Sequence, residues 1–421
     1  MGLFLSCCRP GRLHGRTAEL TTSSPAGVAP RKATLRDVEV AHKRVLTRVD
    51  FNVPLEGARI LDDTRIRESL PTINDLRARH ARVILVTHVG RPDGAVDEAF
   101  RTTPLASRLS QLLGSPVRHL DDCVGPEIEA AVGGLRDGDV VMLENVRFHL
   151  GETRNDPTFA RELAALGEVF VNDAFGTAHR AHASTVGVTA YLPSVAGLLM
   201  AREIATLGRI MTDPPRPLVA VIGGSKISTK IGVLKSLLER VDRLCVGGAM
   251  ACTFLKAKGL DMGRSLVEDD QLDTARSLLA APARGRTLIL PLDAVVAADA
   301  KPGVPAKTVS VDAVPPELKV LDVGPMTVER FLQVCDGAGA VVWNGPLGVY
   351  EVPPFNRGTQ ALAEGLAGSQ AETIIGGGDL VAAVQELHLA DRMSFVSTGG
   401  GATLEFLEGK RLPGIAALRD A

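Results

Sequence analysis

The sequence predicts an α/β protein of two Rossmann-like domains, each a mainly parallel sheet between two layers of helices, joined by a hinge helix. The chain has 421 residues, more than the roughly 250–300 at which a single hydrophobic core usually stops growing. Short apolar strands alternate with helical segments, a pattern typical of parallel sheets covered on both faces. The pattern stops at the helix breaker DPPRP, residues 213–217, and then restarts.

The strands of the first domain, predicted over residues 34–200, end in polar or charged residues. These strands are predicted at residues 45–50, 83–88, 140–144 and 169–173, with helix-like periodicity over residues 155–166. A run from Ser194 to Met211 reads as one helix, which would join the two domains.

Most strands of the second domain, predicted over residues 201–398, end in glycine. They are predicted at residues 218–224, 244–248, 287–290, 341–346, 373–378 and 394–401. Open parallel sheets bind ligands at the carboxyl ends of their strands, so these glycine-rich ends predict a binding site.

Composition narrows the class of partner. Hydrophobic residues make up 45% of the chain and charged residues 23%, as in ordinary soluble enzymes. A net charge of −2 and a 4% aromatic share argue against nucleic acid as a partner. Because the net charge is close to zero, an anionic ligand would have to be bound by a local cluster of cationic side chains. The six cysteines have no zinc or disulfide spacing, which indicates a reducing compartment and hence the cytoplasm.

The first 33 residues do not share this pattern. MGLFLSCC matches a myristoylation signal at Gly2 with a cysteine pair for a second lipid, and the early arginines also resemble a transit peptide. The interpretation we favour is a disordered tail or a start codon assigned too early, with translation beginning near Val28. Organelle import and lipid anchoring remain the alternatives.

Polar and basic residues cluster at the strand ends of the first domain. RVDFNVP supplies Arg48, Asp50 and Asn52, and THVGRPDG supplies His88 and Arg91. Further basic residues follow in the loops, namely Arg65 just before a predicted helix, Arg147, His179, Arg180 and His182. If these loops share one rim, they suit a small ligand with phosphate and carboxylate groups. Asp50 and Asn52 would then accept from a hydroxyl of that ligand. The isolated histidines His42, His80, His119 and His388 have no motif around them and are expected to be structural.

The stretch AVIGGSKISTKIG, residues 220–232, predicts a phosphate-binding loop that is not a Walker P-loop. A P-loop needs Gly directly before Lys and Ser or Thr directly after it, whereas here Ser225 precedes Lys226 and Ile227 follows. A helix starting near Ser225 would place Lys226 and Lys230 on one face at its positive end. Two cations so placed favour an anion between them.

Two further glycine turns lead into predicted helices. In GGGDL, Asp379 either caps the helix or holds Mg²⁺ between nucleotide phosphates. STGGG, residues 397–401, repeats the arrangement. Repetition around one sheet strengthens the prediction of phosphate contacts.

Taken together, these motifs resemble the phosphoglycerate kinase family from Thr34 to about Leu418. They run in the order RVDFNVP, THVGRPDG, MLENVRFH, NDAFGTAHRAHAST, GGSKISTKIGVL, WNGPLGVYE, GGGDL and STGGGATLEFLEGK. The resemblance implies a hinged monomeric enzyme that transfers a phosphoryl group from 1,3-bisphosphoglycerate to ADP, giving 3-phosphoglycerate and ATP. Such an enzyme would act in glycolysis and gluconeogenesis or in carbon fixation. It also implies that residues 399–421 return to the first domain.

The resemblance assigns a role to each matching position. The residues implied to bind 3-phosphoglycerate are Asp50, Asn52, Arg65, His88, Arg91, Arg147 and Arg180. Those implied to bind nucleotide are Lys226, Lys230, Gly324 on the adenine side, Glu351 at the ribose, Gly377, Gly378, Asp379 and Leu380. Arg65, Lys226, Gly377 and Gly400 are implied to act in the transfer, and Asp379 is implied to hold Mg²⁺.

Two positions depart from the family pattern and suggest a weaker nucleotide site. Leu380 stands where the family usually has Thr or Ser, and Met326 where Lys is frequent. A lost charge-assisted contact would cost about 1.5–3 kcal/mol. Leu380 supports one rival hypothesis, a nucleotide-binding relative without activity. The lipidation signal in the first 33 residues supports the other, a membrane-tethered protein.

Overall fold

Six parallel strands form the sheet of the N-terminal half, in the order β5-β6-β4-β1-β7-β8. The computed structural model describes residues 31–281 and 285–421. The strands are β1 (Arg44–Arg48), β4 (Arg82–Val86), β5 (Val117–His119), β6 (Val140–Met142), β7 (Val169–Asn172) and β8 (Ser194–Ala196). Because β1 pairs with both β4 and β7, the carboxyl ends of these three strands lie side by side.

Helices cover both faces of this sheet. They are α1 (Thr64–Ala78), α2 (Thr103–Leu113), α3 (Pro126–Gly133), α4 (Leu150–Thr153) and α5 (Pro157–Ala165). Along β4, Val83 and Leu85 pack with α1 and α2, whereas Ile84 and Val86 pack with α3 and α5. Successive side chains of a strand point to opposite faces, so a strand buried on both sides reads as the continuous apolar run seen in the sequence.

The C-terminal half repeats the design with the order β11-β10-β9-β15-β16-β17. The strands are β9 (Leu218–Ile222), β10 (Arg243–Val246), β11 (Thr287–Ile289), β15 (Ala340–Asn344), β16 (Glu372–Gly376) and β17 (Phe395–Val396). Numbered within this sheet, the order is 3-2-1-4-5-6, and the direction of winding reverses between β9 and β15. Sheets of this type bind ligands in the crevice at that reversal.

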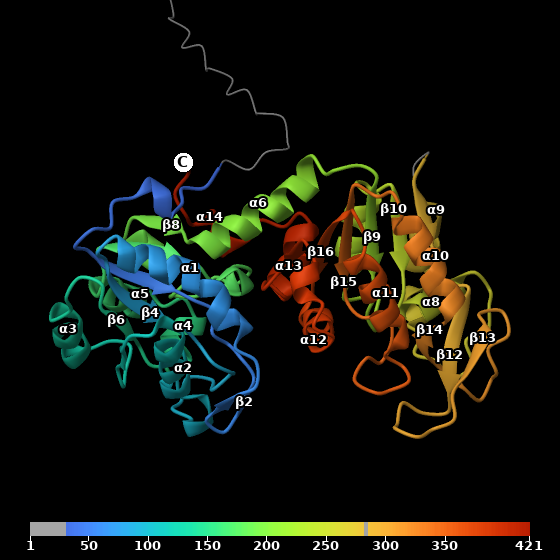
Figure 1. The fold of residues 1–421 in the computed structure, drawn as a ribbon, viewed down its shortest axis with the longest axis horizontal. Helices are drawn as coiled ribbons and strands as arrows, with labels where there is room; N and C mark the ends of the chain where they lie inside the picture. The colour runs from blue at the N-terminus through green and yellow to red at the C-terminus, as the bar shows by residue number, and fades with distance from the viewer. Residues whose placement is uncertain (1–30, 282–284) are drawn as a thin grey trace, which may run out of the picture.

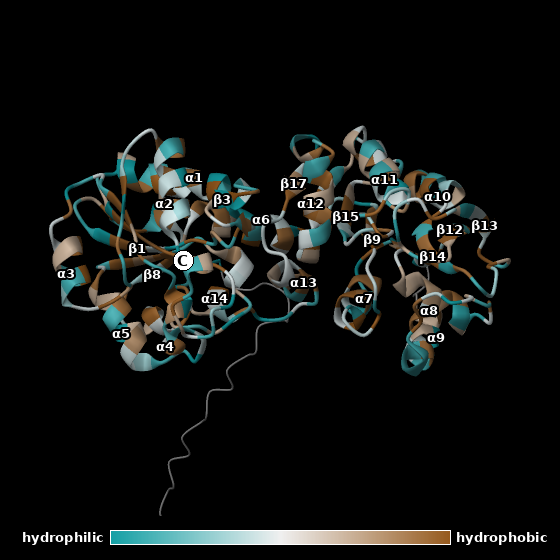
Figure 2. Ribbon diagram, turned by 90° about the horizontal axis from the view of Figure 1, so that it is seen from below, coloured by the Kyte–Doolittle hydropathy of each residue, from teal (hydrophilic) through white to brown (hydrophobic). Residues whose placement is uncertain are grey.

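Two apolar layers enclose this second sheet. The helices are α7 (Ile231–Leu238), α8 (Met250–Ala257), α9 (Leu272–Ala280), α10 (Pro325–Cys335), α11 (Arg357–Ala367), α12 (Gly378–Glu386) and α13 (Gly401–Leu407). Ala220 and Ile222 of β9 face the cluster formed with α7 and α8, and Val219 and Val221 face α10 and α11. Figure 2 colours the strands around β1 and β9 at the hydrophobic end of its scale. The predicted fold class, two three-layer α/β/α units with mainly parallel sheets, is confirmed.

Helix α6 (Leu198–Thr212) connects the two halves (Figure 1). The prediction of one helix from Ser194 to Met211 is wrong at its start, because Ser194–Ala196 form β8. Val195 pairs with Val171 of β7 and is completely buried, so strand pairing overrides the helical periodicity there.

The C-terminus lies on the N-terminal half (Figure 1). Helix α14 (Pro413–Ala416) contacts the segment after β7, where Gly414 N donates to Ala178 O at 2.8 Å. Arg419 N donates to Ser194 O at 3.0 Å, and Lys32 Nζ pairs with the Asp420 carboxylate at 2.7 Å.

The sequence did not predict two small antiparallel sheets. One contains β12 (Asp293–Ala297), β13 (Lys307–Ser310) and β14 (Lys319–Val323), and the other is the hairpin of β2 (Leu55–Glu56) and β3 (Arg59–Ile60). Within residues 31–281 and 285–421, no helix is long and apolar enough to cross a membrane. The predictions of a lipidated or imported head fall on residues outside the described ranges.

Candidate active site

The polar and basic residues predicted at strand ends gather beside the carboxyl ends of β1, β4, β6 and β7. Asp50 and His88 follow β1 and β4, and Arg147 lies in the 3₁₀ turn η3 (Val146–Phe148) after β6. Arg180 follows η4 (Phe175–Thr177), which comes after β7. All four strands are adjacent in the sheet, so four loops distant in sequence form one rim.

A buried network holds His88 in place. Arg48 is completely buried; its Nη2 lies 3.0 Å from His88 Nδ1 and its Nε donates to Ser184 Oγ at 2.8 Å. Glu152, also buried, accepts from Ser184 Oγ at 2.7 Å and balances the Arg48 charge. Burial, followed by the charge of Arg48, holds the pKa of His88 well below 6.5. Since Arg48 can only donate, neutral His88 accepts at Nδ1 and carries its proton on Nε2.

Arg65 reaches into the same rim from α1. Its Nη1 lies 2.5 Å from Asp50 Oδ2. The prediction that Arg65 lies in a loop before a helix is wrong, because α1 begins at Thr64 and includes it. Asp62, which accepts from Thr64 N at 2.9 Å, sets this earlier start.

Several buried polar atoms in this region have no hydrogen-bond partner among the described residues. They include Asp50 Oδ1, Arg147 Nε and His179 Nδ1. His182 Nδ1 differs from these three, because it lies 3.6 Å from Glu152 Oε1. Arg147 uses Nη1 to bond Gly90 O at 2.6 Å, and burial lowers its pKa to about 10. Buried polar groups are normally paired, so these free donors and acceptors indicate a place where a polar ligand binds.

Asn52 and Arg91 are less enclosed. Asn52 Oδ1 accepts from Gly90 N at 2.9 Å, and both side chains are exposed. Asp50 therefore has the free acceptor atom predicted for a substrate hydroxyl, whereas the Asn52 oxygen already has a partner.

The predicted lysine pair is separated by the structure. Helix α7 begins at Ile231, with Lys230 at its N-cap, and not near Ser225. Ser228 N and its hydroxyl bond to the Glu268 carboxylate, and Thr229 Oγ1 bonds back to Lys226 O at 3.0 Å. Such side-chain bonds compete with helix formation. Lys226 is consequently exposed on a turn and does not share a helix face with Lys230.

Lys230 lies at the crevice between β9 and β15. Its Nζ donates to Asn344 Oδ1 at 2.8 Å and to Asn344 O at 3.2 Å. Burial lowers the pKa of Lys230 to about 8, opposed by the charge of Asp379. Asn344 Nδ2 is buried without a partner in the described chain.

A cavity of about 340 Å³ opens from this crevice. Its walls are mainly apolar, with Leu255, Val320 and Leu347 among them, and Glu351 and Asp379 also line it. Gly324 does not line this cavity. It is the N-cap residue of α10 and borders a separate cavity of about 890 Å³. Its neighbour Val323 lines both cavities.

The glycine turn before α12 presents backbone N–H groups. Gly377 has a φ of 95°, which favours glycine, and a Cβ there would lie 3.3 Å from Asn344 Nδ2. The first N–H groups of α12, from Gly378 to Leu380, have no partner within the helix. Asp379 is exposed in this first turn and makes no side-chain cap bond.

Leu380 does not face this turn. Its side chain is completely buried in the cluster beneath β15 and β16. The expectation that a hydroxyl here would meet a phosphate is therefore not supported by the orientation of the side chain. Met326, the other departure, is 59% exposed.

The STGGG loop joins the two halves. Gly399 packs closely against Phe175 of η4, and a Cβ on Gly401 would lie 3.8 Å from His179 Nε2. Gly400, at the start of α13, thus lies beside the loop that carries Arg180. Gln385 Nε2 of α12 also donates to Thr64 Oγ1 of α1 at 2.9 Å. The rim that carries Asp50, His88, Arg147 and Arg180, called the basic rim below, therefore borders the interface between the two halves. The glycine turns border the same interface.

The sequence did not indicate the supporting residues Glu152, Ser184 and Asn344, nor Glu203, which accepts from Ser397 Oγ and Thr398 N of the STGGG loop. It listed Arg48 among the strand-end cations, whereas the structure buries Arg48 beneath His88. The one available signal was a charged residue inside an apolar segment, as with Arg48 in VLTRV and Glu203 in LLMAREIATL. Their partners come from distant segments, which no local motif reveals.

Known proteins resemble this chain over most of its length. The family model for phosphoglycerate kinase matches residues 35–410. A phosphoglycerate kinase of Pelotomaculum thermopropionicum is 56% identical over 390 residues, covering 92% of this chain and 99% of that protein. The one from Moorella thermoacetica is 54% identical over 390 residues, with the same two coverages. The solved structure of phosphoglycerate kinase from Coxiella burnetii has a TM-score of 0.82 and 42% identity, covering 92% of this chain and 98% of that one.

Proposed function

Because the chain belongs to the phosphoglycerate kinase family, we propose that its two halves each bind one substrate and react only when brought together. The enzyme catalyses reversible phosphoryl transfer from 1,3-bisphosphoglycerate to ADP, giving 3-phosphoglycerate and ATP, in glycolysis and gluconeogenesis. What remains to be assigned is the part each residue plays.

The basic rim is proposed to bind 3-phosphoglycerate. The observation that carries this assignment is the set of unpaired buried atoms on Asp50, Arg147 and His179. Arg65, Arg91, Arg147 and Arg180 supply cations for the phosphate and carboxylate. Asp50 Oδ1 accepts from the substrate hydroxyl, and neutral His88 donates from Nε2. Asn52 completes the rim.

The cavity beside β9 and β15 is proposed to bind the nucleotide. Its apolar walls enclose the base, and Glu351 accepts from the ribose hydroxyls. Lys230, the backbone N–H groups of Gly377, Gly378 and Leu380, and exposed Lys226 meet the phosphates. Gly324 acts indirectly, because its place at the start of α10 sets the position of Val323.

Asp379 is proposed to hold the Mg²⁺ that accompanies the nucleotide. The donor set fits this ion, since Mg²⁺ is usually held by one or two carboxylates together with substrate phosphates. Asp379 is exposed, its carboxylate is not bonded to its own helix, and it lines the cavity. Bound there, Mg²⁺ would neutralise charge on the phosphate oxygens.

The rate of phosphoryl transfer then depends on how the protein positions its cations and N–H groups around the phosphoryl group. Phosphoryl transfer needs little covalent help from protein, so cations and N–H groups must surround the moving group and exclude water. Arg65 supplies a guanidinium from one half; Lys226, Gly377 and Gly400 supply an ammonium and N–H groups from the other. Closure along α6 and the STGGG loop brings these groups together.

A coupled assay of ATP formation from 1,3-bisphosphoglycerate and ADP tests the activity, with dialysis against a chelator and readdition of Mg²⁺ testing the ion. Turnover that requires Mg²⁺ and falls strongly in Asp379→Asn supports the assignments. Nucleotide binding without turnover would instead support the rival hypothesis of an inactive relative.

We also propose a monomer that works in a reducing compartment such as the cytoplasm. The four cysteines in the described chain are free thiols, which suits a reducing environment. Gel filtration with light scattering tests the first assignment. Cell fractionation with intact mass of the native protein tests the second, and acyl mass or a membrane fraction would contradict it.

A further inference from the structure

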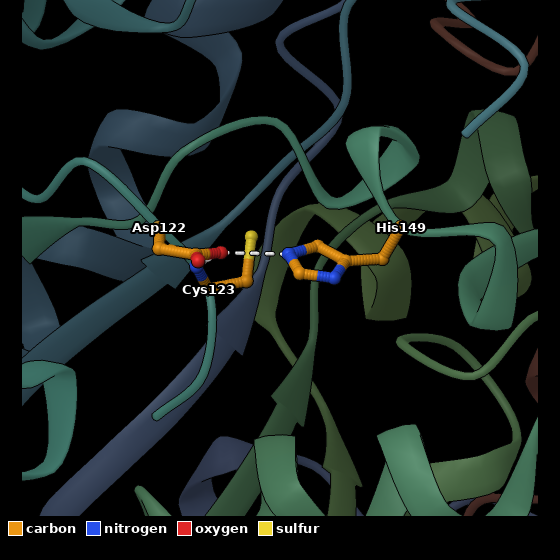
Figure 3. Close-up of side chains that lie close together, drawn as sticks. All are labelled: Asp122, Cys123 and His149. Atoms are coloured by element: carbon orange, nitrogen blue, oxygen red, sulfur yellow. Dashed lines mark hydrogen bonds and ion pairs between the residues drawn. The ribbon is translucent and has the colours of Figure 1, made fainter. Parts of the chain in front are cut away.

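Three side chains with metal-binding atoms meet outside the proposed active site (Figure 3). Asp122 and Cys123 lie in the loop after β5, and His149 follows η3. One ligand atom from each, a carboxylate oxygen, Sγ and a ring nitrogen, lie within 4.8 Å of one another. In the part of the chain that the structure describes, no other cluster of His, Cys, Asp and Glu meets this condition.

We propose that Asp122, Cys123 and His149 bind a divalent cation that prefers sulfur and nitrogen ligands, such as Zn²⁺ or Cd²⁺. Mixed thiolate, imidazole and carboxylate donors select these ions over Mg²⁺ and Ca²⁺, which prefer oxygen. Bond lengths of about 2.0–2.3 Å in a tetrahedral site put the ligand atoms about 3.3–3.8 Å apart. Shifts of about 1 Å in the exposed Asp122 and half-buried His149 side chains would reach that spacing.

The framework around the cluster is already held in place. Cys123 Sγ is completely buried and donates to Glu144 O at 2.9 Å, and Cys123 N donates to Asp122 Oδ1 at 2.6 Å. The His149 ring stacks on Phe159 with centroids 4.8 Å apart. His149 Nε2 and Asp122 Oδ1 are 2.6 Å apart, and this surface ion pair is the contact that a cation would replace.

The surroundings of the thiol keep it protonated. Burial, followed by the carboxylates of Asp122, Glu144 and Glu152, raises the pKa of the Cys123 thiol well above its usual range, while Arg48 opposes them. Binding would form a metal–sulfur bond and release the thiol proton to solvent. Because that proton must be displaced from a buried site, we expect weaker binding than at a four-ligand structural zinc site.

A bound cation would weaken the binding of 3-phosphoglycerate more than the binding of nucleotide. His149 is two residues after Arg147, which the proposed function places at 3-phosphoglycerate. This consequence rests on that proposed function, whereas binding itself does not. We expect the cation to raise the KM for 3-phosphoglycerate and to leave the KM for nucleotide unchanged.

The test is a Cd²⁺ titration of the full chain carrying Cys7→Ser and Cys8→Ser, since those two thiols lie outside the described residues and would bind metal themselves. The thiolate-to-cadmium absorption in the ultraviolet should saturate at one equivalent. Cys123→Ser should abolish this absorption, and His149→Gln should weaken binding by about tenfold or more. Cys245→Ser, which removes a buried thiol on β10, is the matched control and should leave the titration unchanged.

An absent absorption band, or one that persists in Cys123→Ser, would overturn the proposal. If Cys123→Ser does not fold, Asp122→Asn and His149→Gln alter only partly exposed side chains, and unchanged affinity in both would overturn it equally. Cd²⁺ binding with no effect on the KM for 3-phosphoglycerate would instead overturn the predicted effect on substrate binding and leave the metal site itself supported.

Discussion

The carboxylate of Glu203 accepts hydrogen bonds from the backbone N–H of Thr398 at 2.7 Å and from the hydroxyl of Ser397 at 2.8 Å. Glu203 belongs to α6, which connects the two halves, and Thr398 belongs to the STGGG loop that packs on both. Glu203 is completely buried, and burial raises its pKa to about 7. The connecting helix and the glycine loop are therefore joined through a carboxyl group that titrates near neutral pH.

The pKa of Glu203 makes stability depend on pH. The folded state holds this proton up to about pH 7, whereas the unfolded chain releases it near the ordinary value of 4.5. The contribution to folding is fully present below pH 4.5 and is lost as pH rises through 7, a change on the order of 3 kcal/mol. Glu203→Gln, which keeps the shape without the charge, should flatten the fall in unfolding free energy between pH 5 and 8. Urea unfolding at several pH values measures this slope, and an unchanged slope would show that Glu203 is already ionised at pH 5.

Arg65→Ala should lower turnover far more than it weakens 3-phosphoglycerate binding. A cation over the transferred group stabilises charge mainly in the transition state, and its loss in phosphoryl transfer costs roughly 10³–10⁵ in rate. Arg67→Ala is the matched control, because Arg67 lies on the same helix and pairs with Asp63 at 2.8 Å near the surface. The steady-state kcat measures the effect on turnover, and the dissociation constant of 3-phosphoglycerate measures the effect on binding. Near-normal turnover would remove Arg65 from the reaction.

Nucleotide affinity should fall above pH 8. Burial lowers the pKa of Lys230 to about 8, so its charge is present below that pH and is lost above it. The phosphates keep their charge in this range, and the KM for ADP should rise by up to about tenfold per pH unit above 8. Lys230→Met should give a high KM that no longer changes with pH, whereas Lys235→Met, an exposed change on α7, should behave like the parent enzyme. A flat KM profile in the parent enzyme would contradict a phosphate contact by Lys230.

The sequence predicted those features of the fold that depend on residues close together in the chain. Apolar runs ending in Asp50, His88 or glycine predicted both the sheets and the edge at which the site lies, because parallel strands place their carboxyl ends together. Motif order was enough to identify the family. The long helix-like run that ends at the DPPRP breaker indicated the connecting helix.

What could not be predicted depends on contacts between distant residues. Helix α7 starts late because Glu268 bonds to Ser228, and residues 194–196 form a strand because β7 is available for pairing. The role of Glu203 depends on a loop that follows it by almost two hundred positions. Such partners are set by the tertiary fold, which outweighs local propensity.

Leu380→Ser should destabilise the protein and change nucleotide binding very little. The Leu380 side chain is completely buried, and shortening a buried leucine costs about 2–5 kcal/mol. A hydroxyl that reached a phosphate would instead strengthen nucleotide binding by about 1.5–3 kcal/mol, roughly ten- to a hundredfold. Because the side chain points into the core, we expect less than about a threefold change.

Val384→Ala is the matched control for Leu380→Ser, since Val384 lies one turn later on α12 and is buried in the same cluster. Both variants should lower the unfolding free energy, and neither should alter the dissociation constant of ADP much. Thermal unfolding without ligand and calorimetric titration with MgADP measure the two quantities. A tenfold gain in affinity confined to Leu380→Ser would show that the side chain at this position reaches the phosphates, and that leucine there weakens the nucleotide site.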